Sequence, residues 1–168
     1  MRKNKYRNIT LIGMAGVGKS VLGKKLAKRL GYKFLDIDEV IKKQIGLELQ
    51  GIIDKFGEKR VLEIEEEIVL NLGYVNNYII SPGGSIIYSK KAMLFLKKIS
   101  KIIFLHASFK SIERRLLNIN TRGIIGLKEK NLKELYKERN PLYKKYADIV
   151  IRVPDNIDVT NLFKKLTQ

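Results

Sequence analysis

The sequence contains no cysteine and no tryptophan, and it has a single histidine, His106. Without cysteine there is no disulfide, no thiolate nucleophile and no cysteine-ligated zinc site. One histidine cannot build a histidine-based metal site, so His106, which follows an apolar stretch, is predicted to be structural or to face a loop. Apolar runs of membrane-spanning length are also missing, so no membrane span or membrane partner is expected.

The N-terminal residues 1–6 are basic and lead directly into an apolar stretch, without the small-residue cleavage site of a signal peptide. We therefore expect a cytoplasmic protein. The 168 residues suffice for one domain with a sizeable core, and no linker or internal repeat divides them.

Acidic residues are few: 17 Asp and Glu stand against 34 Lys and Arg, a formal net charge of +17. Such a surface attracts polyanions, including nucleic acids, anionic lipids and nucleotides. The basic residues are spread along the chain, however, and no nucleic-acid-binding signature accompanies them. Specific nucleic-acid binding is therefore not expected.

The strongest motif is present at residues 13–20, which read G-M-A-G-V-G-K-S and fit the pattern G-x-x-x-x-G-K-[ST]. An apolar, β-branched stretch precedes it, and apolar residues at helical spacing follow it as far as Leu30. In this context backbone N–H groups at a helix N-terminus cradle phosphate oxygens, the lysine reaches the β- and γ-phosphates, and the serine ligates Mg²⁺. The predicted nucleotide-binding residues here are Gly13, Met14, Ala15, Gly16, Val17, Gly18, Lys19, Ser20 and Val21.

Strand and helix signals alternate along the rest of the chain. Strands are predicted at 33–38, 78–81, 101–105 and 148–153, with helices between them. Two further helices are expected, one at 132–146 that is interrupted at Pro141 and one at 159–166. This alternation predicts an α/β fold with a three-layer, doubly wound parallel sheet, in which ligands bind at the carboxyl ends of the strands.

A glutamate-rich segment lies between Gly57 and Gly73. Its apolar residues recur at helical spacing, and Gly57 is expected to break the helix that precedes it. Its glutamates are assigned to the polar face of the predicted helix: Glu58, Glu63, Glu65, Glu66 and Glu67.

Three features fall near the carboxyl ends of the predicted strands. Asp36 and Asp38 lie in the strand predicted at 33–38 and should project from the same side of it. Gly83 and Gly84 follow the next strand and permit close backbone approach to a ligand. A polar, glycine-containing stretch with Arg122 at its centre predicts a mobile lid near 118–128. We expect these features and the phosphate-binding loop to meet in one site.

Taken in order, these motifs resemble the shikimate kinase family, within the nucleoside-monophosphate-kinase-like P-loop kinases. The resemblance spans nearly the whole chain and includes F-L-D-x-D at 34–38, G-E at 57–58 with Glu65, and R-N-P-L-Y at 139–143 before A-D at 147–148. It implies a single kinase domain of residues 1–168, expected to be a monomer. It also implies MgATP-dependent phosphorylation of a hydroxyl on a small carboxylate-bearing metabolite.

On the nucleotide side, the resemblance implies a role for individual residues. Lys19 would be catalytic, and Asp36 would help to hold Mg²⁺ through water. Arg115 would stack on the adenine, and Pro154 would lie in the adenine-binding loop.

On the acceptor side, the resemblance implies that Asp38 orients and deprotonates the acceptor hydroxyl. Arg122 would close over the transferring phosphoryl group, so both residues are assigned as catalytic. Arg139 would bind the acceptor carboxylate, which suits a planar guanidinium. Gly83 and Gly84 would approach the acceptor.

Three positions depart from the family motifs. The arginine of the family's G-E-x-x-F-R falls at Leu62 here and its phenylalanine at Val61. Arg60 lies about 200° from Leu62 around a helix and cannot replace that arginine without a register change. The third loop glycine is Ser85. The lid motif R-P-L-L reads R-G-I-I at 122–125, which is expected to loosen the lid.

These departures leave the acceptor open. Shikimate is the first candidate, because the other acceptor-side residues are retained. Homoserine or a sugar acid is the second. The third alternative is a nucleotide-binding protein that does not catalyse transfer.

Overall fold

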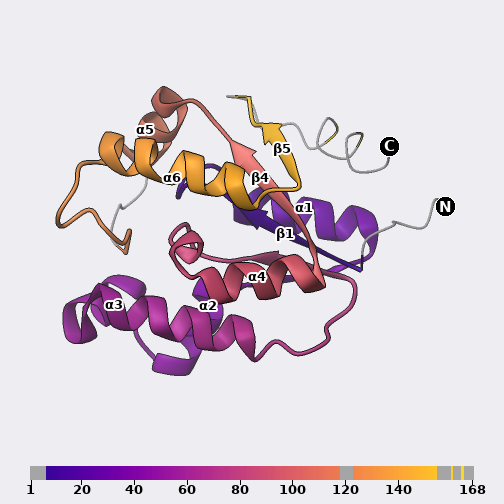
Figure 1. The fold of residues 1–168 in the computed structure, drawn as a ribbon, viewed down its shortest axis with the longest axis horizontal. Helices are drawn as coiled ribbons and strands as arrows, with labels where there is room; N and C mark the ends of the chain where they lie inside the picture. Colours follow the sequence, from indigo (N-terminus) through magenta and orange to yellow (C-terminus); the bar gives the residue numbers. More distant parts are fainter. Residues whose placement is uncertain (1–6, 118–122, 155–159, 161–163, 165–168) are drawn as a thin grey trace.

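The computed structural model of the chain describes residues 7–117, 123–154, 160 and 164. A five-stranded sheet of order β2-β3-β1-β4-β5 forms its centre, and all neighbouring strands are parallel (Figure 1). The helix predicted at 159–166 falls largely outside the described residues. The strands are β1 (Asn8–Ile12), β2 (Lys33–Asp36), β3 (Tyr78–Ser81), β4 (Lys101–His106) and β5 (Ile149–Arg152).

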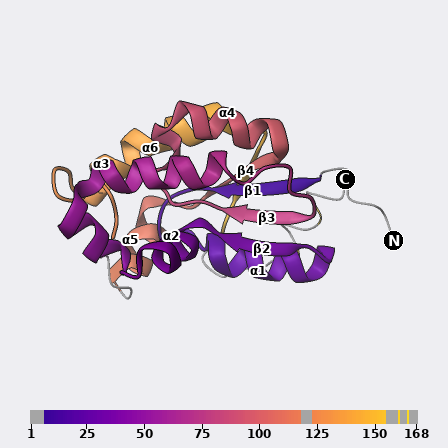
Figure 2. The same ribbon diagram turned by 90° about the horizontal axis from the view of Figure 1, so that it is seen from below.

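Helices cover both faces of this sheet. Helix α1 lies on one face, whereas α3, α4 and α6 lie on the other (Figure 2). The predicted three-layer α/β architecture is thereby confirmed. Among the described residues, none of the helices has the length and apolar character needed to cross a bilayer. The helices are α1 (Lys19–Leu30), α2 (Ile37–Ile45), α3 (Leu49–Leu70), α4 (Lys90–Ile99), α5 (Phe109–Leu117) and α6 (Leu132–Tyr146), with a short 3₁₀ helix η1 (Ile86–Tyr88).

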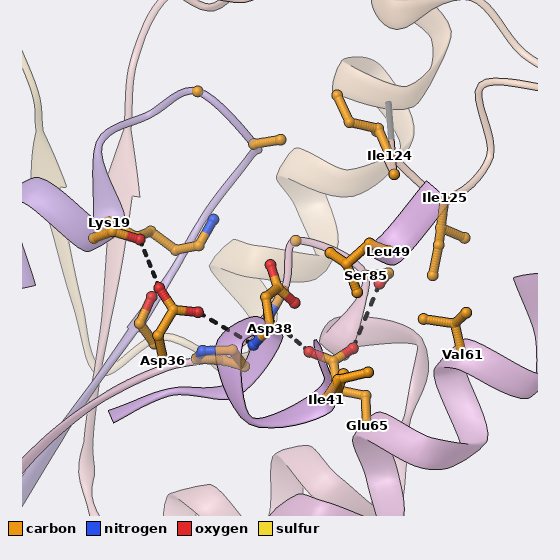
Figure 3. Close-up of a pocket in the computed structure, with 18 of the residues that line it drawn as sticks. Lys19, Asp36, Asp38, Ile41, Leu49, Val61, Glu65, Ser85, Ile124 and Ile125 are labelled. Atoms are coloured by element: carbon orange, nitrogen blue, oxygen red, sulfur yellow. Dashed lines mark hydrogen bonds between the residues drawn. The ribbon is translucent and has the colours of Figure 1, made fainter. Parts of the chain in front are cut away.

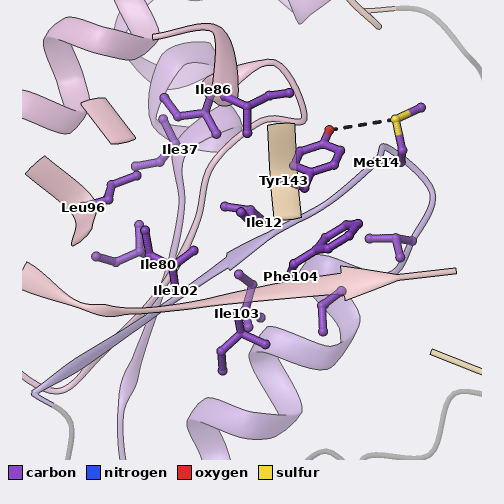
Figure 4. Close-up of a cluster of buried hydrophobic side chains, with 14 of the residues drawn as sticks. Ile12, Met14, Ile37, Ile80, Ile86, Leu96, Ile102, Ile103, Phe104 and Tyr143 are labelled. Atoms are coloured by element: carbon purple, nitrogen blue, oxygen red, sulfur yellow. Dashed lines mark hydrogen bonds between the residues drawn. The ribbon is translucent and has the colours of Figure 1, made fainter. Parts of the chain in front are cut away.

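The central strands β1 and β4 are buried because helices cover both of their faces. On one side of them the ring of Phe104 stacks on Tyr143 of α6, with 5.0 Å between the ring centroids. The Tyr143 hydroxyl in turn points to the sulfur of Met14 in the phosphate-binding loop (Figure 4). This packing holds α6 and the loop against the same end of the sheet.

The predicted placement of Asp38 in a strand is wrong, because Asp38 lies in the first turn of α2. The strand ends at Asp36, whose side chain accepts a hydrogen bond from the Asp38 backbone N–H at 3.1 Å. An aspartate in this position caps a helix, so the chain turns into α2 instead of extending. The expectation that both carboxylates project from one side of a strand is therefore wrong.

Two predicted helix breaks have different outcomes. Gly57 does break α3, because its φ of 82° and ψ of 161° are not helical. Pro141 does not interrupt α6, which continues from Leu132 to Tyr146. A proline inside a helix removes one backbone hydrogen bond. The buried side chains of Arg139 and Tyr143, on either side of it, hold this helix in place.

Candidate active site

A pocket of about 380 Å³ lies at the carboxyl ends of β1, β2 and β3, within the size range of small-molecule sites. The predicted features converge on it, because each follows one of these strands or comes from a helix or loop beside them. Arg122 lies outside the described residues, although its neighbour Gly123 lines the pocket. The predicted residues that line the pocket are Ala15, Gly16, Gly18, Lys19, Ser20, Val21, Asp36, Asp38, Gly83, Gly84, Arg115 and Arg139.

The phosphate-binding loop curls around the N-terminus of α1. Gly16 and Gly18 have φ values of 79° and 101°, and no side chain caps the helix. The first-turn N–H groups of α1 therefore remain available to an anion, and the helix dipole adds positive potential there. The side chain of Lys19 donates to the carbonyl oxygens of Gly13 at 2.9 Å and Met14 at 3.2 Å. Gly13, Met14 and Val17 thus build the loop without lining the pocket.

Lys19 is half-buried at the pocket, and desolvation by the surrounding protein lowers the pKa of its ammonium group. The carboxylates of Asp38 and Asp36 oppose this shift and raise the pKa. A bound phosphate would act in the same direction as these carboxylates, because a nearby negative charge favours the protonated amine. The site is therefore suited to hold Lys19 as a cation beside a phosphate.

Ser20 and Asp36 form the candidate metal site. The Ser20 hydroxyl donates to Asp36 Oδ2 at 2.8 Å. Hydroxyl and carboxylate oxygens are ligands that Mg²⁺ accepts, with water and substrate phosphates supplying the rest. The described part of the chain has no cluster of three or more His, Cys, Asp or Glu side chains that could hold a metal. The residues present therefore fit a magnesium ion that depends on nucleotide phosphates for its other ligands.

Arg115 connects the phosphate-binding loop to the end of the sheet. Its guanidinium donates to the carbonyl oxygen of Val17 at 3.1 Å and to that of Pro154 at 3.0 Å. Pro154 does not line the pocket itself, but Arg115 holds it beside the loop. A role for the two residues in binding adenine stays a prediction.

Two carboxyl groups, Asp38 and Glu65, share one wall of the pocket (Figure 3). A Cβ atom on Gly83 would lie 2.9 Å from Glu65 Oε1 and 3.0 Å from Asp38 Oδ1, so any larger residue would displace these carboxyl groups. Glu65 accepts hydrogen bonds from the Gly83 N–H at 2.6 Å and from the Ser85 hydroxyl at 3.5 Å. Burial raises the pKa of Asp38 to about 6 and that of Glu65 to about 8.

Arg139 reaches the pocket from α6 and is almost entirely buried. Its Nη2 donates to the carbonyl oxygen of Ile125 at 2.6 Å, and its Nε donates to the Tyr88 hydroxyl at 3.2 Å. The acceptors of these two hydrogen bonds are neutral, so an anionic ligand in the pocket can add a charge-assisted contact to the guanidinium. The predicted role of Arg139 in binding an acceptor carboxylate stays a prediction.

The family model described as shikimate kinase matches residues 15–167 of the chain. The chain is also 41% identical over 147 residues to the shikimate kinase of Thermodesulfovibrio yellowstonii, covering 86% of this chain and 84% of that protein. The chain belongs to the shikimate kinase family. Family membership confirms the resemblance and makes the protein a P-loop kinase rather than a non-catalytic nucleotide binder.

Other shikimate kinases are similar to this chain over most of their length. The enzyme of Francisella tularensis subsp. novicida is 32% identical over 164 residues, covering 96% of this chain and 93% of that protein. The structure of the Acinetobacter baumannii enzyme in complex with shikimate gives a TM-score of 0.84 at 27% identity, covering 98% and 93% of the two chains. That of the Aquifex aeolicus enzyme gives 0.78 at 30% identity, covering 95% of each chain.

Glu65 is one of several pocket residues that the sequence prediction did not place in the site, and the one that carries an ionisable group. The sequence predicts it on the polar face of a helix, but it is buried, as are Val61 and Val69 about one turn away on either side. The available signal was its spacing, because residues four apart lie on the same face of a helix. A single glutamate in an apolar stripe points to a specific polar role.

The positions at which the sequence departs from the family motifs lie in different surroundings. Val61 lines the pocket, whereas Leu62 lies outside the lining and packs partly buried against the core. Arg60 is exposed and pairs with Glu63 at 3.2 Å and Glu67 at 3.1 Å. Arg60 therefore does not replace the missing arginine. This agrees with the prediction from the angle between Arg60 and Leu62 around the helix.

Proposed function

We propose that this member of the shikimate kinase family transfers the γ-phosphoryl group of MgATP to the 3-hydroxyl of shikimate. The observation that carries the proposal is the meeting, in one pocket, of Lys19, Asp38 and Arg139. These side chains address three parts of the reactants, which are the charged phosphates, the neutral attacking hydroxyl and the charged acceptor carboxylate.

On the nucleotide side, the backbone N–H groups of the loop and the first turn of α1 bind the phosphates. Lys19 leaves its carbonyl partners to contact the β- and γ-phosphates and neutralise their charge. The Ser20 hydroxyl and, through water, Asp36 would hold Mg²⁺, which would supply neutralisation of the charge on the phosphate oxygens.

On the acceptor side, Asp38 accepts the proton of the attacking hydroxyl. The pKa of Asp38 is raised to about 6, so the carboxylate is mostly ionised at neutral pH yet more basic than an exposed aspartate. A base with a pKa near the working pH is efficient in proton transfer. Arg139 binds the acceptor carboxylate and thereby sets which hydroxyl faces Asp38.

The acceptor wall also bears on the choice of substrate. Aliphatic side chains of Ile41, Leu49 and Val61 line it next to the polar groups. A ring with an apolar face, such as that of shikimate, can pack against them, whereas a linear polyhydroxy acid would leave hydroxyls without partners there. This favours shikimate over a sugar acid.

A phosphoryl-transfer assay on a panel of acceptors tests the proposal. Shikimate, homoserine and gluconate are each offered with MgATP, and product is measured directly rather than as ADP release. We expect turnover with shikimate at least about tenfold more efficient than with the others, since loss of one matched charge-assisted contact has about that effect. Turnover of homoserine or gluconate without turnover of shikimate would instead support the second candidate, a kinase for another hydroxy acid.

A further inference from the structure

Residues 123–126, which we call the lid segment, contribute Ile124 and Ile125 to the pocket (Figure 3). Leu49 and Val61 of α3 line the same pocket. Three backbone groups of this short segment bind side chains from elsewhere in the chain. Two of those side chains come from α3 and one comes from α6.

The first contact involves the position at which the lid motif departs from the family pattern. Gly123 donates its backbone N–H to Gln50 Oε1 at 2.8 Å. Its φ is +87°, and a Cβ there would lie 2.9 Å from the Cβ of Leu49. Proline, which the family motif has at this position, lacks the N–H and is restricted to negative φ. Glycine at this position thus supplies a tie to α3 that proline could not donate. The expectation that the altered motif loosens the lid stays a prediction.

The second contact involves Glu58, the residue that follows the break in α3. Gly126 donates its N–H to Glu58 Oε1 at 2.9 Å, in a partly buried setting. Gly126 also has a positive φ, +92°, and approaches Leu135 of α6 closely. A hydrogen bond to a carboxylate is stronger than one to a neutral oxygen. Glu58 is therefore the stronger of the two α3 ties.

The third contact joins the lid segment to the proposed acceptor-binding residue. Arg139 donates to the carbonyl oxygen of Ile125, which lies between the two tied N–H groups. The lid segment, α3 and Arg139 consequently form one hydrogen-bonded unit around the acceptor half of the pocket. A shift of the lid segment would change the direction of the Arg139 guanidinium.

We propose that Gln50 and Glu58 are positioning residues that hold the lid segment over the acceptor half of the pocket. Through them, seating of the lid segment and binding of the acceptor are linked, because α3 supplies both the ties and part of the acceptor wall. The kinetic consequence rests on the proposed function, whereas the structural tie does not.

Amide hydrogen exchange of the ligand-free protein tests the tie directly. Gln50→Ala should speed exchange of the Gly123 amide, and Glu58→Ala that of the Gly126 amide, each by about two- to tenfold, as expected for loss of one hydrogen bond. Glu58→Gln keeps an oxygen acceptor and should restore most of the protection. Glu63→Ala is the matched control, since it removes an exposed glutamate of the same helix that pairs with Arg60. Unchanged exchange at both amides, or equal changes in the control, would overturn the proposal.

Steady-state kinetics test the linkage. Gln50→Ala and Glu58→Ala should raise the KM for shikimate several-fold, leave the KM for ATP within about twofold, and increase ATP hydrolysis per phosphoryl transferred, since a poorly seated lid segment admits water. A parallel fall in kcat with both KM values unchanged would contradict the linkage. Should the wild-type protein show no turnover of shikimate while the exchange results hold, the proposed substrate fails and the tie stands. If the wild-type protein turns over shikimate normally but the variants show unaltered amide exchange, the tie fails and the proposed substrate stands.

Discussion

The nucleotide half and the acceptor half of the pocket are built in different ways. The nucleotide half comes mainly from one contiguous stretch, residues 13–20, and offers backbone groups and one lysine. The acceptor half is assembled from α2, α3, the loop after β3, the lid segment and α6. Phosphates can be recognised by a local backbone turn, whereas a small hydroxy acid needs side chains brought together from distant parts of the chain.

Electrostatics follow the same division. The nucleotide half relies on the helix terminus and on groups close to the surface, such as the exposed pair of Ser20 and Asp36. The acceptor half buries the ionisable groups Asp38, Glu65 and Arg139, which raises the pKa of both carboxyls. Substitutions in the first half should therefore act on phosphate chemistry. Those in the second should act on substrate selection and pH dependence.

The largest effect is expected for Lys19→Ala, in the nucleotide half. Turnover should fall at least about hundredfold, because the phosphates lose their compensating cation during transfer. Thermal unfolding should change little, since the side chain contacts loop carbonyls rather than the apolar core. Activity above about a tenth of wild type would contradict the kinase mechanism.

Asp38→Asn should lower turnover nearly as much, but through the acceptor half of the pocket. Without the carboxylate, the attacking hydroxyl has no proton acceptor, so kcat should fall on the order of hundredfold. Affinity for ATP should stay within about twofold. Should ATP affinity fall in step with kcat, the roles of Asp36 and Asp38 have been exchanged.

Glu65→Gln tests the electrostatic difference between the nucleotide half and the acceptor half. The pKa of Glu65 is raised to about 8, so the folded state keeps its proton at pH values where the unfolded chain has lost it. The wild type should therefore lose stability as pH rises from about 5 to about 8, by on the order of 1–3 kcal/mol more than the variant. Urea unfolding of both proteins at several pH values measures this, and parallel curves would contradict the assignment.

Leu62→Arg restores the family arginine at the edge of the acceptor half. Leu62 lies outside the pocket lining, so an arginine at this position must reach into the pocket from outside that lining. The KM for shikimate should then fall by about two- to tenfold, the value of one hydrogen bond to a charged group with incomplete geometry. A rise in this KM would mean that the pocket is shaped for another acceptor, against which the charge is unpaired.

Arg60→Ala should have the smallest effect. Its partners Glu63 and Glu67 are exposed, and exposed pairs contribute only about 0–1 kcal/mol. The KM for shikimate should remain at the wild-type value. A several-fold increase would show that Arg60 binds the acceptor after all and that the acceptor half has kept its second arginine.

Much of the fold and of the nucleotide half could be predicted from the sequence, because their signals are local. A buried strand, a glycine-rich loop and an amphipathic helix follow one another within residues 8–30. The boundary at Asp36 was harder, since the same short stretch can extend as a strand or cap a helix. The prediction of a helix break at Pro141 was wrong for the opposite reason. The local preference of proline to break a helix is outweighed by the packing of side chains on both sides of it.

The sequence by itself determined the phosphate-binding loop, the alternation of strands and helices, and the residue types available to the acceptor. Only the tertiary structure decided that Glu65 is buried, that Leu62 lies outside the pocket, and that Gly123 is tied to Gln50. The physical reason is the range of the interactions. A phosphate cradle is made by neighbours in the chain, whereas Gly83 with Glu65, Ile125 with Arg139 and Gly123 with Gln50 are separated by 18, 14 and 73 residues.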